Sequence, residues 1–92
     1  MNFRLFTFTR INAYGNLIGL HHFGKEDEAQ SAMEKAITEK LERLKSCGWD
    51  IESGKVAVTY SADKTSAIIE FGESKEEFKI SERWIEIEVY IV

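Results

Sequence analysis

The stretch Trp84-Ile-Glu-Ile-Glu-Val-Tyr-Ile-Val92 carries the clearest structural signal in this chain of 92 residues. Every second residue from Ile85 to Ile91 is β-branched and apolar, which is typical of a β-strand with one buried face. The remaining side chains of the alternation are two aromatic and two acidic ones. We therefore expect a terminal strand whose aliphatic face forms the floor of the core and whose other face points to solvent or to a partner.

A long helix is predicted over residues 26–47. Apolar side chains recur there at three- and four-residue intervals and would form one stripe along the helix. These are Ala29, Ala32, Met33, Ala36, Ile37, Leu41 and Leu44. Three acids at 26–28 place negative charge where the helix dipole favours it, and Gly48 supplies a natural stop.

The other elements read as strands joined by turns. Residues 3–11 and 17–23 flank the turn composition Asn-Ala-Tyr-Gly-Asn, and they predict a hairpin with a five-residue loop. Three further strands are expected after the helix, at 55–60, 66–71 and 77–80, with Ser81-Glu82-Arg83 leading into the terminal strand. The predicted fold is α+β: an antiparallel β-sheet of five to six strands, in the order β-β-α-β-β-β-β, with one long helix packed across one face. Residues 1–92 make a single domain at this length.

Cysteine usage and hydropathy indicate the compartment. Cys47 is the only cysteine, so no disulfide can form within the chain, which favours a reducing environment. No apolar run reaches the roughly 18 residues that a membrane span needs, and the N-terminus lacks the features of a signal peptide. We expect a cytoplasmic protein. Cys47 would follow the negative end of the helix dipole, which disfavours a thiolate, so we expect it to be a small buried residue.

Charge is divided unevenly along the chain. Seven glutamates and three basic residues lie in residues 66–92, and this region alone accounts for the net charge of −4; residues 1–24 contain no acid. A solvated outer sheet face would explain this. The sharper hypothesis is an acidic surface with aromatic anchors that binds the basic surface of a protein partner, without a cofactor. Its expected contact residues are Trp84, Glu86, Glu88, Tyr90, Glu70 and Glu82.

In its size, acidity and lack of catalytic residues, the chain resembles the inhibitors that phages encode against bacterial defence systems. This resemblance implies an inhibitor that occupies a partner's basic surface. The apolar terminus Ile91-Val92 must also be covered, because an exposed strand of that kind invites aggregation. A homodimer through the sheet is one way to cover it.

The N-terminal strand supports a different hypothesis. Both of its faces carry apolar residues, so periodicity alone does not say which one is buried. If Arg4, Phe6, Phe8 and Arg10 face outward, they interleave basic and aromatic side chains, as surfaces that stack single-stranded nucleic acid do. The competing account pairs this strand with the terminal one. Arg4 and Arg10 would then lie beside Tyr90 and Trp84, or beside Glu88 and Glu86.

The adjacent histidines His21 and His22 raise a third possibility, a small metal-dependent or hydrolytic protein. Adjacent residues of a strand point to opposite faces, so the two rings cannot chelate one ion while the strand is regular. The chain has no glycine-rich phosphate loop and no Cys/His ligand set. We therefore expect a protein that is not an enzyme.

Overall fold

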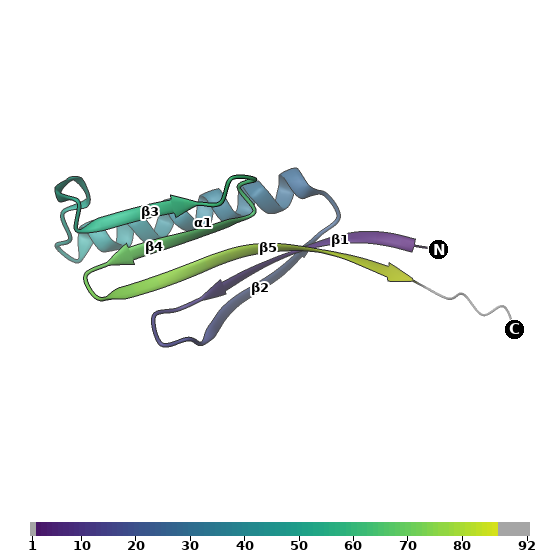
Figure 1. The fold of residues 1–92 in the computed structure, drawn as a ribbon, viewed down its shortest axis with the longest axis horizontal. Helices are drawn as coiled ribbons and strands as arrows, with labels where there is room; N and C mark the ends of the chain where they lie inside the picture. Colours follow the sequence, from purple (N-terminus) through teal and green to yellow (C-terminus); the bar gives the residue numbers. More distant parts are fainter. Residues whose placement is uncertain (1, 87–92) are drawn as a thin grey trace, which may run out of the picture.

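The computed structural model describes residues 2–86 and confirms the α+β class, with a five-stranded antiparallel sheet and one helix (Figure 1). The elements in chain order are β1 (Asn2–Ile11), β2 (Leu17–Phe23), α1 (Glu26–Ser46), the 3₁₀ turn η1 (Ile51–Ser53), β3 (Val56–Tyr60), β4 (Ser66–Phe71) and β5 (Ser74–Glu86). The predicted hairpin, the helix and the strands predicted at 55–60 and 66–71 are thus confirmed within one or two residues, whereas the short strand predicted at 77–80 is part of the longer β5. The rest of the predicted terminal strand, Ile87, Glu88, Val89, Tyr90, Ile91 and Val92, lies outside the described residues.

The strand order is β2-β1-β5-β4-β3, and every neighbouring pair is antiparallel. The first strand therefore lies beside the last, as predicted. Its register differs from both predicted alternatives, because Arg4 lies opposite Trp84 and Arg10 lies opposite Phe78.

The reason for the shifted register is that β5 is one continuous strand. The predicted break at Ser81-Glu82-Arg83 is wrong, since these three residues pair with β1 at positions 5–7. Their polar composition is typical of a turn, yet the alternation of β5 runs through them without interruption. At 13 residues β5 is about 43 Å long. The 21-residue helix is only about 32 Å long, so the strand extends beyond it.

The core lies between α1 and one face of the sheet. On β1 and β5 this face carries the even-numbered residues, including Phe6, Phe8, Phe78 and Ile80. Ile85 has the opposite parity and lies on the helix-free face. The expectation that the aliphatic residues of the terminal strand form the core floor is therefore wrong for Ile85. The buried apolar residues are Phe6, Phe8, Ala29, Met33, Ala36, Ile37, Leu44, Val56, Ala67, Ile69, Phe78 and Ile80.

Helix α1 begins and ends where the sequence indicates. Its first turn carries Glu26, Asp27 and Glu28. Gly48 follows its last turn with φ +92°, and Trp49 donates its backbone N–H to the carbonyl of Leu44. No helix in the described part of the chain combines the length and the apolar character needed to cross a bilayer. Cys47 is exposed at this helix end, so the expectation that it is buried is wrong.

The turn between β4 and β5 yields a first prediction. Gly72 has φ +62°, and a Cβ there would lie 2.9 Å from the indole of Trp49. That indole packs edge-on against Phe71, with ring centroids 5.9 Å apart. Gly72→Ala should lower the free energy of unfolding by about 1–2 kcal/mol, because it adds backbone strain and displaces Trp49. Urea denaturation monitored by tryptophan fluorescence measures this.

Gly24→Ala is the matched control for the added methyl group, because a Cβ at Gly24 meets no atom within 4 Å and Gly24 has no positive φ. If the two substitutions cost the same, the proposed conflict with Trp49 does not exist.

Candidate protein-interaction surface

The first residues of β1 and the last residues of β5 form a two-stranded ribbon that extends beyond the rest of the sheet. The last pair between β1 and β2 is Phe6 with Phe23, and the last pair between β4 and β5 is Ser66 with Lys79. Beyond these points residues 2–5 pair only with residues 83–86 within the described chain. Figure 1 shows this ribbon running past the end of α1. We call residues 2–5 and 83–86 the β1–β5 ribbon.

Trp84 is the most prominent side chain of the ribbon. It is 65% exposed, an unusual state for so large an apolar group. The guanidinium of Arg4, directly across the strand pair, lies 5.7 Å from the centroid of the indole ring and 5.1 Å from that of Phe6. These contacts hold the indole against the ribbon while most of its surface stays in water.

Glu82 completes this arrangement. Its Oε1 accepts a hydrogen bond from Nε of Arg4 at 2.7 Å. The hydrogen bond raises the pKa of Arg4, and the guanidinium, which is charged in proteins in any case, lies over the indole ring. Glu82 and Trp84 lie on the same face of β5, as residues two apart in a strand must. We call Arg4, Glu82 and Trp84 the Trp84 cluster.

The remaining predicted contact residues are not all on this surface. Glu70 lies opposite Lys75 in the sheet and on the helix-free face of β4. The Trp84 cluster lies on the other face, the one that carries the buried residues of β1 and β5. Glu70 and Glu82 therefore point to opposite sides of the sheet. Glu88 and Tyr90 lie outside the described residues, and for Glu86 only the backbone is described, opposite Asn2.

The face of β1 that was considered for nucleic-acid binding is the face that points toward the core. Arg4, Phe6, Phe8 and Arg10 do share one face of β1, but Phe6 and Phe8 are only 5% and 3% exposed beneath α1. Bases cannot stack on rings that are already packed in the core, so these two aromatics are not available as a stacking platform.

The two histidines lie on opposite faces of the edge strand β2, as predicted. His22 lies on the helix-free face, where its Nδ1 is 2.9 Å from the hydroxyl oxygen of Thr7. His21 lies opposite Phe8 and lines a groove between α1 and the β1–β2 hairpin. Residues 2–86 contain no group of three or more His, Cys, Asp or Glu side chains placed to hold a metal ion.

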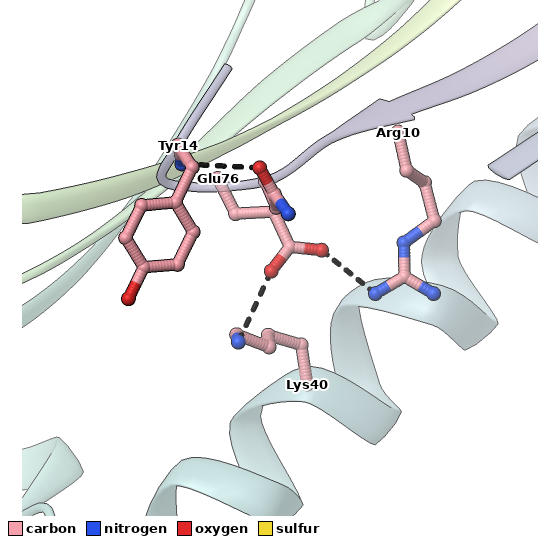
Figure 2. A network of polar contacts seen from close by, with 5 residues as sticks. Arg10, Tyr14, Lys40 and Glu76 are labelled. Carbon is pink, nitrogen blue, oxygen red and sulfur yellow. Dashed lines mark hydrogen bonds and ion pairs between the residues drawn. The ribbon is translucent and has the colours of Figure 1, made fainter. Parts of the chain in front are cut away.

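One charged cluster was missed by the sequence interpretation. Glu76, expected in a turn, lies in β5 and is only 2% exposed. Its carboxylate accepts a hydrogen bond at 2.8 Å from an Nη atom of Arg10, and Nζ of Lys40 lies 3.1 Å from its other oxygen. Figure 2 shows Glu76 between the arginine on β1 and the lysine on α1. This triad links helix to sheet, and its position indicates a structural role.

The sequence carried little signal for this triad. Glu76 and Glu77 are adjacent acids in a polar segment, and only the register of β5 decides which one is buried.

Comparison with protein-family models, with curated proteins and with solved structures finds no match to this chain.

Proposed function

We propose that this chain is a small acidic protein-interaction module that acts by occupying the basic surface of a protein partner, as the inhibitors that phages direct against bacterial defence systems do. The observation that carries the proposal is the exposed Trp84 on the β1–β5 ribbon. Tryptophan is among the residues most enriched at the energetic centres of interfaces. An indole that is already oriented loses little conformational entropy on binding.

Charge supports the choice of a basic partner. The protein carries −4, and Glu86 and Glu88 follow Trp84 within four residues. In the described part of the surface, Glu82 already forms an ion pair with Arg4. Because these two charges largely cancel, the pair contributes little to the attraction of a basic partner. The acidic residues near the chain end would supply the attraction, steering a basic partner toward the indole.

The test is affinity capture from a bacterial lysate, followed by identification and purification of the captured protein and titration against it. Trp84→Ala should weaken that binding by about 30-fold, the effect of losing a hot spot worth about 2 kcal/mol. The fold should survive, because the indole is mostly exposed; circular dichroism and the thermal midpoint check this. Binding by Trp84→Ala at the wild-type affinity would contradict the proposal.

Tyr14→Ala is the matched control. Tyr14 is 88% exposed in the β1–β2 turn, at the opposite end of β1 from Arg4. Removing this aromatic side chain, which is more exposed than Trp84, should leave binding unchanged. Glu88→Lys and high salt should both weaken binding if the partner surface is basic. A salt-insensitive complex would argue for a partner of another chemistry.

A further inference from the structure

A groove with a volume of about 280 Å³ lies between α1 and the β1–β2 hairpin. The apolar part of its lining consists of the rings of Phe8 and Phe23 and the methyl groups of Ala32 and Ala36. The two alanines lie one helical turn apart on the same side of α1, and their short side chains leave the space open. Pockets for drug-sized ligands hold roughly 300–1,000 Å³, so this groove suits a smaller molecule with an apolar body.

The polar part of the lining is mostly basic. Among the described residues it consists of Arg10, His21 and Lys35, with Glu39 as the one acid. Within residues 2–86 the side chains of His21 and Lys35 take part in no hydrogen bond or ion pair. Glu39 follows Lys35 by one turn of α1, yet the two side chains are not paired. The groove therefore presents basic groups that are available to an anion.

Arg10 brings an excess of positive charge to this groove. Glu76 is the one acid of the described chain that forms an ion pair with Arg10 or Lys40, so the triad has two cations and one anion. Charges removed from water are usually balanced by a counter-charge. One Nη of Arg10 donates to Glu76, the other points away from it (Figure 2), and Nε is buried without a hydrogen-bond partner among residues 2–86. The guanidinium therefore keeps unused donors and a charge that a second anion would balance.

We propose that the groove binds a small aromatic carboxylate, with its ring against the two phenylalanines and its carboxylate toward Arg10 and Lys35. The planar guanidinium of arginine matches the geometry of a carboxylate, and aromatic rings pack favourably against one another. The ligand supplies the second anion that the triad lacks. Glu39 in the same lining opposes further negative charge, which favours a monoanion over phosphate or a dicarboxylate.

Two other hollows of the described surface lack this combination. On the helix-free face, Lys79 shares a hollow with Glu77, so its charge is offset. Near the first turn of α1, Lys64 shares a hollow with two acids, Asp27 and Glu34. The groove also has no residue in common with the Trp84 cluster, so the ligand site and the protein-interaction surface can be tested separately.

Isothermal titration calorimetry of the full chain with phenylacetate tests the proposal. The dissociation constant should be about 1 mM or lower, which is within reach of a ligand of this size. Phenylacetamide, the neutral amide of the same shape, should bind at least about tenfold more weakly, because it lacks the charge. Lys35→Gln should weaken phenylacetate binding about fivefold, the effect of losing one exposed ion pair. In an amide shift map of the wild type, phenylacetate should move the signals of His21, Phe23 and Ala32.

Lys45→Gln is the matched control, because it removes the same charge from an exposed position in the last turn of α1, outside the groove. It should leave the dissociation constant unchanged, and circular dichroism checks the fold of both variants. Equal weakening by the two substitutions would reduce the effect to general charge and overturn the proposal. So would equal binding of phenylacetamide, binding of inorganic phosphate as tight as that of phenylacetate, or no binding at tens of millimolar. If Lys35→Gln does not fold, the shift map decides: signals that move only outside the groove refute the site.

Discussion

Phe78→Ala is expected to lower the free energy of unfolding by about 4 kcal/mol, the largest effect of any single truncation in this core. Phe78 is 1% exposed on the central strand β5. Its ring stacks on that of Phe8 with centroids 6.4 Å apart, and the guanidinium of Arg10 lies 5.2 Å from its centroid. The substitution opens a cavity where two strands and the helix meet, and it removes the aromatic contacts as well.

Urea denaturation followed by circular dichroism measures this effect. Domains of this size have a total stability of about 5–15 kcal/mol, so Phe78→Ala can leave little folded protein. Phe78→Leu, which keeps most of the volume, should cost about half as much and stays measurable. Phe3→Ala is the control, because Phe3 is 45% exposed on the helix-free face of β1. A cost at Phe3 equal to that at Phe78 would mean that the core is on the other side of the sheet.

The elements with strong local signals were predictable from the sequence. The loop before β2 is an example: Asn12 accepts hydrogen bonds from the backbone N–H groups of Tyr14 and Asn16 through its side chain, and Gly15 has φ +79°. These roles depend only on residues within the turn. Helix α1 is similar, since its apolar stripe and the stop at Gly48 are both visible in a single segment.

The direction in which β1 faces was not predictable. Phe6 and Phe8 on one side compete with Phe3, Leu5 and Ile11 on the other, and both patterns satisfy a period of two. Contacts with distant parts of the chain decide which face of β1 is buried. Helix α1 covers the face that carries the even-numbered residues, where Ile80 lies opposite Phe8. A one-residue slip would exchange the two faces, and no local property of β1 opposes it.

The register also explains why only part of the candidate surface could be predicted from the sequence. The pairing of the first and last strands was predicted. Trp84 was expected on the face away from the core, but it shares the face of Phe78 and Ile80 and is exposed because the β1–β5 ribbon extends beyond α1. Which acids join Trp84 depends on parity across neighbouring strands, and this parity is set by register. Glu82 therefore falls beside Arg4, while Glu70 falls on the far side of the sheet.

Glu76→Gln is expected to lower the free energy of unfolding by about 3 kcal/mol, because it removes the one anion that two partly buried cations share. The amide keeps the shape of the side chain but cannot offset the charges of Arg10 and Lys40. Their side chains retain 24% and 17% exposure, so both recover some hydration, and the loss lies at the low end for a broken buried pair. Glu77→Gln is the control on the adjacent residue: its 3.6 Å contact with Lys75 is exposed and should contribute less than about 0.5 kcal/mol.

Lys40→Met separates charge balance from simple loss of a contact. This substitution leaves Arg10 and Glu76 as a matched pair, and the thioether keeps apolar contact with Phe71, over whose ring Nζ of Lys40 lies at 4.9 Å. The expected cost is therefore below about 1 kcal/mol, much less than that of Glu76→Gln, which removes both ion pairs of the triad and leaves two cations without their anion. Chemical denaturation of the two variants under identical conditions compares them directly. Equal losses would show that the triad acts through packing between α1 and β5 and that its charge balance contributes little.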